Sequence, residues 1–229
     1  MFSNCKYVTY FTYNEAGGLF SDCRNLANVV SMFEGANYLH GGIPVNFFGS
    51  TNLPYVLSLK NMFASTLILY DIADDSHKWI NQETVLPLIN LDNIDGMFKN
   101  GRLSTNNYRS KYSVSPVKTQ VKDGANDVYI ISPDTFMYKN ISYIREFFMN
   151  TDYFNIPFQF SGFLYASDAF YDSAITEINT NFVNENNISL IKDVTRMFYD
   201  YTTGTPSKSI TNLEAFITAI VQYTSIQKA

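Results

Sequence analysis

The sequence is poor in the residues on which catalysis and metal binding most often depend. Its 229 residues include only two histidines and two cysteines. The cysteines, Cys5 and Cys23, are too few for the disulfide framework of a small secreted protein, so a reducing compartment is the simpler expectation. With His40 and His77 as the only imidazoles, the supply of general bases is thin.

Long apolar runs and an excess of positive charge are also absent. No stretch approaches the roughly 20 apolar residues that a membrane span needs. Residues 1–14 alternate polar and aromatic side chains, unlike a signal peptide. Charged residues make up 16% of the chain, and 16 Lys and Arg against 21 Asp and Glu leave a net charge of -5. We therefore expect no membrane association and no sequence-specific contact with nucleic acid.

Aromatic and other hydrophobic side chains are abundant instead. Hydrophobic residues make up 46% of the chain, and 19 Phe and 17 Tyr dominate its aromatic content. A chain of this length can bury about 70% of its unfolded surface, so we expect one folded domain over residues 1–229. Tyr is also enriched at protein interfaces, which makes an interface and a densely aromatic core equally good explanations of the surplus.

Local patterns predict an α/β (α+β) fold, with a mixed β-sheet, flanking helices and a C-terminal helical hairpin. Alternation over residues 7–13 is typical of a strand, and apolar spacings of three and four over 19–33 predict a helix. Two further apolar stripes, over 190–198 and 213–221, predict the hairpin. Thr211 and Glu214 would form the capping box of its second helix. No internal repeat is evident at this level.

A long polar segment over residues 99–126 is predicted to be a loop or an exposed hairpin. It is rich in Asn, Ser and Lys, and its basic residues are interleaved with Tyr108 and Tyr112. Loops of this length are often functional. Because Asp123, Asp127 and the net negative charge oppose a phosphate backbone, a protein partner is the favoured interpretation over nucleic acid.

The short motifs of catalytic, cofactor and metal sites are incomplete. Asn93, Asp95 and Gly96 resemble part of a calcium loop, but Leu91 and Arg102 stand where the first and last ligands would be. No glycine-rich phosphate loop ending in Lys-Ser or Lys-Thr is present. We therefore expect no catalytic residues, no cofactor and no metal.

Four short stretches carry a resemblance to a known family. They are residues 18–22 (GLFSD), 43–47 (IPVNF) and 83–91 (ETVLPLINL), and Tyr112 with 115–118 (SPVK). In this order they resemble the tail terminator, or tail completion, proteins of contractile-tailed bacteriophages, and 83–91 is the most specific piece. The stretches cover under half of the chain, and none of them is a catalytic motif.

The resemblance implies a virion structural protein without enzymatic activity. It would be a tail terminator or a neck or connector ring subunit that caps the tail tube and joins it to the head. Its expected partners are further copies in a hexameric ring and other tail tube, sheath or neck proteins, and its expected location is the virion tail or neck and the host cytoplasm during assembly. The interface candidates are Phe47, Phe48, Tyr108, Arg109 and Tyr112.

Two alternatives belong to other functional classes. The first is a small α/β enzyme or ligand-binding protein of unknown substrate, for which Glu15, His40, Asp75 and His77 form the only plausible polar cluster. The second is a general interaction module, which would be a stable monomer with an exposed apolar patch.

Overall fold

The structure is a computed structural model of the chain. It describes residues 2–5, 7–8, 11, 18–20, 22–39, 43–44, 46–66, 68, 82–101, 120–123, 126–129, 135–151, 155–156, 159–173, 175, 177–178, 182–183, 185–200, 205–206 and 210–223.

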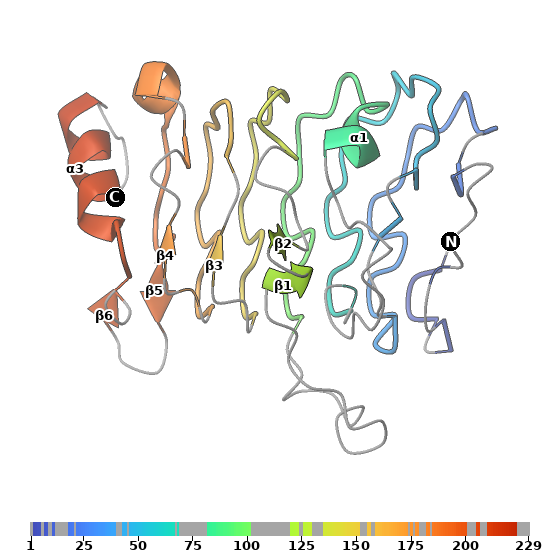
Figure 1. Ribbon diagram of the computed structural model, residues 1–229, viewed down its shortest axis with the longest axis horizontal. Coiled ribbons are helices and arrows are strands. Elements are labelled where there is room, and N and C mark those ends of the chain that lie inside the picture. The colour runs from blue at the N-terminus through green and yellow to red at the C-terminus, as the bar shows by residue number, and fades with distance from the viewer. Residues whose placement is uncertain are drawn as a thin grey trace.

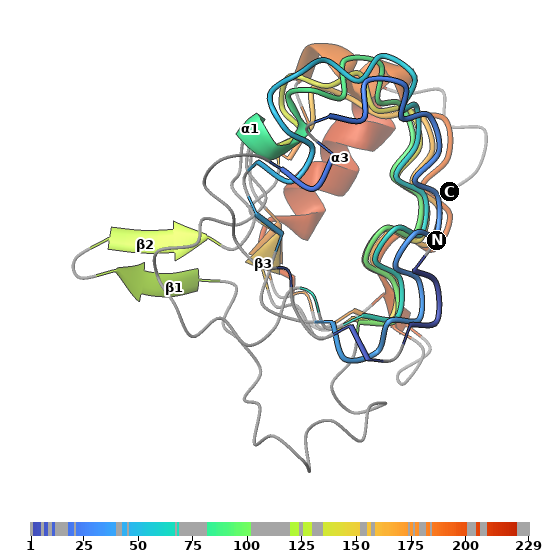
Figure 2. The same ribbon diagram turned by 90° about the vertical axis from the view of Figure 1, so that its right-hand side faces the viewer.

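The chain winds into a solenoid, in which successive coils stack along one axis. Figure 1 shows the coils in chain order between the two termini, and Figure 2 shows them end-on, superposed around a common interior. In such an architecture each coil contacts mainly the coils before and after it. Stability therefore depends on the match between neighbouring coils.

One side of each coil is a segment that repeats in sequence and structure, which we call a rung. In most rungs an aliphatic residue is followed three residues later by a Met or Phe and then by a Phe that every rung shares. The six rungs in the described residues, numbered from the N-terminus, are 26–36, 56–66, 91–101, 141–151, 163–173 and 191–200. Equivalent positions are 50 residues apart between Asn100 and Asn150 but 28 apart between Asp168 and Arg196. The expectation of no internal repeat was wrong, because this uneven spacing hides a repeat of fixed pattern.

Each rung bends through tight turns whose third residue has a positive φ. The first turn is closed by bonds such as that from the Met62 N–H to the Leu59 carbonyl, at 3.0 Å. Gly, Asn, Asp and Ser tolerate or adapt to this left-handed conformation, and they hold most of the positions. The first-turn residues are Ser31, Asn61, Gly96, Glu146, Asp168 and Arg196, and the second-turn residues are Gly35, Ser65, Asn100, Asn150 and Asp172.

Backbone hydrogen bonds join each rung to the next in a parallel ladder with a fixed direction. Rung 3 is typical: four of its amide N–H groups donate to four carbonyls of rung 4. The donors Ile94, Gly96, Phe98 and Asn100 pair with Tyr143, Arg145, Phe147 and Met149 at 2.9, 2.7, 3.1 and 2.8 Å. The second and third residues of rungs 3 to 6 donate back to the preceding rung, as Asp92 and Asn93 do to the Leu57 carbonyl, whereas the later inter-rung donors of rungs 1 to 5 pair with the following rung. The two ends of the ladder are therefore chemically different.

A column of phenylalanine rings fills the interior behind the rungs. Neighbouring rings stack with their centroids 5.4 to 6.1 Å apart and their planes within 20° of parallel. Phe2 extends the column at its N-terminal end, 5.3 Å from Phe33. Such contacts add to the free energy gained by burying the rings. The six rings contributed by the rungs are Phe33, Phe63, Phe98, Phe148, Phe170 and Phe198, all buried.

Short regular elements lie on the other sides of the coils. Helix α1 (Gln82–Val85) precedes rung 3, and β1 (Gln120–Asp123) pairs antiparallel with β2 (Asn126–Tyr129) in a hairpin that projects from the solenoid (Figure 2). Strand β3 (Asn155–Ile156) pairs parallel with β4 (Glu177–Ile178). The 3-10 helix η2 (Glu185–Leu190) leads into rung 6.

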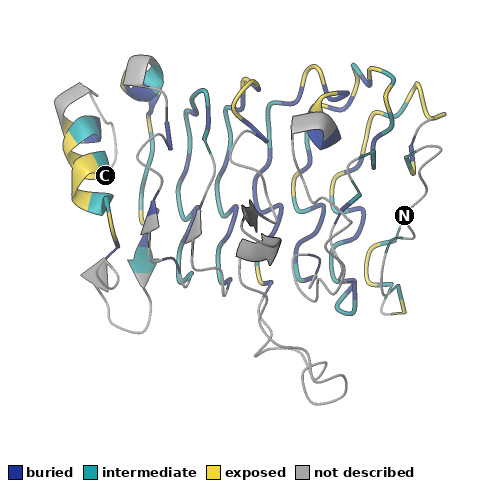
Figure 3. Ribbon diagram, viewed as in Figure 1, coloured by how far each residue is buried: buried dark blue, intermediate teal, exposed yellow. Residues whose placement is uncertain are grey.

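The C-terminal end of the solenoid is covered in two places. Strand β5 (Tyr199–Asp200) at the end of rung 6 pairs antiparallel with β6 (Thr205–Pro206). Helix α3 (Leu213–Tyr223) packs its Phe216 ring against Phe182 and Phe198, with centroids 5.5 and 5.9 Å apart. Figure 3 shows buried segments along the coils and exposed residues on α3 at this end.

The predicted α/β fold with a mixed sheet, flanking helices and a C-terminal helical hairpin was wrong. In the described residues the strands form only two-stranded ladders, and the α-helices are α1, of four residues, and α3, of 11. The second helix of the predicted hairpin exists as α3, but residues 190–198 lead into and form rung 6. Residues 22–33 are likewise non-helical: 22–25 lead into rung 1 and 26–33 form most of it. Their amides donate to the next coil or close tight turns, and the positive φ of Ser31 is incompatible with a helix.

The predicted polar segment 99–126 is described only in part. Residues 99–101 end rung 3, and β1 and Asn126 belong to the projecting hairpin. The remainder lies outside the described residues.

Candidate functional site: the ladder face

The outward side chains of the six rungs form one continuous surface, which we call the ladder face. Parallel bridges align Ser58, Asn93, Tyr143, Tyr165 and Asp193 across successive rungs. The side chains in this row are small and polar in rungs 2 and 3 and aromatic in rungs 4 and 5. The ladder face therefore has a polar half and, over rungs 4 to 6, an aromatic half.

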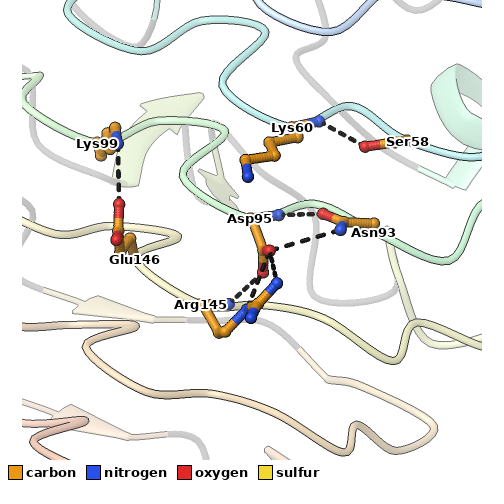
Figure 4. Close-up of polar contacts among 7 residues, drawn as sticks. All are labelled: Ser58, Lys60, Asn93, Asp95, Lys99, Arg145 and Glu146. Carbon is orange, nitrogen blue, oxygen red and sulfur yellow. Dashed lines mark hydrogen bonds and ion pairs between the residues drawn. The ribbon is translucent and has the colours of Figure 1, made fainter.

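A buried carboxylate joins the two halves between rungs 3 and 4. Asp95 is 5% exposed and accepts hydrogen bonds from the Arg145 backbone N–H at 2.8 Å, from Nε at 3.0 Å and from Nη2 at 2.6 Å. Figure 4 shows Asp95 between Asn93 and Arg145, with the Lys99–Glu146 ion pair at 2.8 Å beside it. The hydrogen bond to Asp95 raises the pKa of Arg145 above its usual value, so this guanidinium stays charged.

Two tyrosine pairs characterise the aromatic half. Tyr143 and Tyr165 stack with centroids 5.1 Å apart, and Tyr171 and Tyr199 stack at 5.5 Å. All four side chains are partly exposed. Because each ring lies against the equivalent ring of a neighbouring rung, the tyrosines are ordered before any partner arrives.

Cationic side chains lie over these rings. The Arg145 guanidinium is 5.1 Å from the centroid of Tyr143, and the Lys192 ammonium is 5.9 Å from that of Tyr165. Distances under about 6 Å allow a favourable cation–π interaction. The alternation of cation and ring makes this surface both apolar and charged.

Arg196 is held in the same way at the end of the face. Its guanidinium lies 5.4 Å from the centroid of Tyr171, and its Nε and Nη2 are 2.8 and 2.9 Å from the two carboxylate oxygens of Asp168. The hydrogen bond to Asp168 raises the pKa of Arg196. Arg196 is a ready donor and stacking group on an exposed surface.

The predicted interface residues lie elsewhere or outside the described residues. Phe47 and Phe48 are 1% and 2% exposed, and their rings contact each other in the core at 5.0 Å. They stabilise the interior of the solenoid and present no surface to a partner. Tyr108, Arg109 and Tyr112 lie outside the described residues.

The structure does not place the polar cluster proposed for the enzyme alternative. Glu15, His40, Asp75 and His77 all lie outside the described residues. Among the residues that are described, no group of His, Cys, Asp and Glu side chains is arranged to hold a metal ion. Cys5 and Cys23 are free thiols.

Lys139 is a buried titratable group of the described part of the chain. It is 9% exposed, and its Nζ donates to the carbonyls of Leu86 and Leu88 at 3.2 and 3.0 Å. Burial lowers the pKa of Lys139 from 10.5. Its contacts tie two coils together, which is a structural role.

The residues of the aromatic half were not singled out from the sequence. Tyr143, Tyr165 and Tyr171 carry no motif of their own, because their alignment depends on pairing between distant rungs. The sequence signal that could have revealed this alignment is the recurring Phe of the rungs, which is usually preceded by Met or Phe. Aligning the rungs on that Phe places Tyr171 and Tyr199 in one column, and Tyr143 and Tyr165 in another.

Comparisons with known proteins found no relative of this chain. No protein-family model matches the chain, no curated protein is significantly similar to it, and no solved structure matches its fold. None of the helices in the described residues is long and apolar enough to cross a membrane.

Proposed function

We propose that this protein is a non-enzymatic protein-binding solenoid whose partner contacts the aromatic half of the ladder face. The observation that carries the proposal is the ordered array of stacked tyrosines and overlying cations across rungs 4 to 6. Tyr and Arg are, together with Trp, the residues enriched among the hot spots of protein interfaces. Solenoids in general use such extended surfaces for binding.

Preorganisation supports the same conclusion. Tyr143, Tyr165 and Arg145 are already held by stacking and by the buried Asp95. A partner that binds them loses little additional side-chain entropy, which otherwise opposes association. The mixed charge of the face also favours a protein partner over a uniformly anionic polymer.

The test is affinity capture with paired tyrosine variants. Bait carrying Tyr143→Ser and Tyr165→Ser should retain a specific partner at least tenfold less than wild-type bait, because each hot-spot side chain contributes on the order of 2 kcal/mol. Tyr55 and Tyr138 are 59% and 65% exposed and lie outside the rungs, so their double Ser variant is the matched control. Equal retention by all three baits would contradict the proposal.

A second copy of the chain is one possible partner at this surface. Light scattering of the wild-type protein and of the Tyr143→Ser, Tyr165→Ser variant over a range of concentrations measures it directly. A molar mass that falls toward the monomer only in the variant identifies self-association through the ladder face.

A tail terminator or neck subunit is a narrower form of this proposal and stays a prediction. The resemblance to tail terminator proteins implies an α/β architecture, which the described residues do not have. We therefore propose only the broader part of that role, a structural, non-enzymatic function in an assembly. A molar mass of about six subunits, with rings in negative-stain images, would favour the narrower form.

A further inference from the structure

The ladder ends at rung 6, which has backbone N–H groups at the same three positions that donate to the following rung in rungs 2 to 5. In rung 5, Ala166, Asp168 and Phe170 donate to the carbonyls of Asp193, Thr195 and Met197 at 2.8, 2.9 and 2.8 Å. The equivalent donors of rung 6 are the amides of Val194, Arg196 and Phe198. Within the described residues these three N–H groups have no hydrogen-bond acceptor. They form an open edge with the two-residue spacing of a strand.

An apolar cavity lies beside this open edge. It has a volume of about 370 Å³ and lies between rung 6 and helix α3. Its rung side includes Val194 and Phe198, and its helix side includes Leu213, Ile217 and Val221. Ile217 and Val221 are 47% and 71% exposed, so the cavity opens to the surface.

The remaining parts of this end are already occupied. Asp200 pairs with Thr205 in the β5–β6 ladder, which closes the far end of rung 6. The Phe216 ring packs edge-to-face with the Phe198 ring at 5.9 Å. Ile220 is 3% exposed, so α3 is anchored in the core. A whole additional solenoid would have to displace this helix, whereas a single extended segment would not.

We propose that this edge and cavity form a docking groove for an extended apolar segment of a partner protein, which adds to the ladder as a parallel seventh rung. The chain itself indicates the chemistry of the occupant, because the same edge of each earlier rung is filled by an extended segment. Such a segment presents carbonyls at alternate residues and turns an aliphatic and an aromatic side chain inward. This is strand addition to an exposed ladder edge.

Two physical terms would drive binding in the groove. Pairing satisfies three backbone N–H groups of rung 6, and the inward side chains of the segment remove the apolar walls of the cavity from water. Arg196 lies at this edge with its guanidinium directed to Asp168, so its aliphatic stem lines the groove. The groove shares Arg196 and Tyr199 with the aromatic half of the ladder face but does not include the tyrosine pair Tyr143 and Tyr165.

The probe is a fluorescent peptide with the sequence of rung 6, Ile-Lys-Asp-Val-Thr-Arg-Met-Phe-Tyr-Asp, titrated into the full chain. Anisotropy should show saturable binding below about 1 mM, and a peptide with Ser in place of its Val and Phe should bind at least tenfold more weakly. Ile217→Arg should weaken binding at least tenfold, because it places a charge in the cavity. Thr218→Arg is the matched control on an exposed position of α3 outside the cavity and should change binding less than twofold.

Hydrogen exchange distinguishes backbone pairing from simple apolar adsorption. Saturating peptide should slow exchange at the Arg196 and Phe198 amides. The Tyr143→Ser, Tyr165→Ser variant should bind the peptide normally, which distinguishes a failure of the groove from a failure of the Tyr143 and Tyr165 contact proposed above. Three results overturn the proposal: no saturable binding, equal binding to Ile217→Arg, or unprotected amides in the complex. A dimer that Ile217→Arg abolishes also overturns it, since the occupant would then be a second copy.

Discussion

Removal of a central ring from the phenylalanine column is the most direct test of the solenoid. Phe98 is 2% exposed and packs against Phe63 at 6.1 Å, Phe147 at 5.5 Å and Phe148 at 5.4 Å. Truncation of a buried Phe to Ala leaves a cavity and lowers the free energy of unfolding by about 3–5 kcal/mol. Because an aromatic pair is worth about 0.5–1.5 kcal/mol beyond its buried area, and Phe98 pairs with rings on both sides, we expect Phe98→Ala near the upper end of that range.

Two further substitutions separate the parts of this effect. Phe98→Leu keeps most of the buried apolar surface and removes the aromatic stacking, so we expect a loss of about 1.5 kcal/mol. Phe2, at the N-terminal end of the column, is half-buried and stacks on Phe33 at 5.3 Å. Because it has less burial to lose, we expect Phe2→Ala to lower the free energy of unfolding by only about 1–2 kcal/mol.

Urea denaturation followed by circular dichroism measures all three variants. With a slope of about 2 kcal/mol per molar urea, Phe98→Ala should lower the midpoint by about 2 M. A loss below about 1.5 kcal/mol for Phe98→Ala, or equal losses for Phe98→Ala and Phe2→Ala, would refute a continuous column through the solenoid. Either result would mean that the rungs are stabilised independently of their neighbours.

Three other substitutions test the turn, the buried amine and the ion pair between rungs. Gly96→Ala should lower the free energy of unfolding by about 1–2 kcal/mol, because the φ of Gly96 is 59° and a new Cβ would meet the Asn61 side chain; a neutral result in chemical denaturation would contradict this. Lys139→Met should cost about 1–3 kcal/mol by removing two hydrogen bonds to backbone carbonyls. Because burial lowers the pKa of Lys139 in the folded state, the unfolded chain binds more protons at pH values just below 10.5, and the stability of the wild type relative to Lys139→Met should rise with pH there. A pH-independent difference would count against the burial of this amine. Asp95→Asn should lower the free energy of unfolding by about 1–2 kcal/mol, a modest loss because the partly exposed Arg145 is screened by solvent. A double-mutant cycle with Arg145→Gln should give a coupling energy of similar size.

The regular apolar spacings in the sequence do mark one buried face, but over residues 19–33 and 190–198 they were interpreted as helices, and the chain leads into and forms rungs there. In rung 6, Val194 lies three residues after Ile191, and Met197 and Phe198 lie three and four residues after Val194, which is also the signature of an amphipathic helix. Here the spacing comes from consecutive four-residue turns, with a positive φ at Arg196. Periodicity alone does not distinguish the two, since both bring every third or fourth side chain to one face.

The candidate site could not be predicted from the sequence for a related reason. Phe47 and Phe48 were proposed as interface residues, yet they are core residues, because aromatic content does not by itself distinguish an interior from an interface. The tyrosines of the ladder face become a site only when rungs 4, 5 and 6 are brought into register. That register is set by backbone hydrogen bonds between segments that are far apart in the chain.

The sequence by itself determined the inventory of the fold: enough Phe for a continuous core, Asn, Asp, Gly and Ser at most of the left-handed positions, and an apolar stripe that becomes α3. Only the tertiary structure decided which rings stack, which tyrosines face outward together, and that Asp95 lies against Arg145, 50 residues later. The physical reason is that turn preferences act over four residues, whereas the ladder is stabilised by pairing between coils of unequal length. No local preference encodes that pairing.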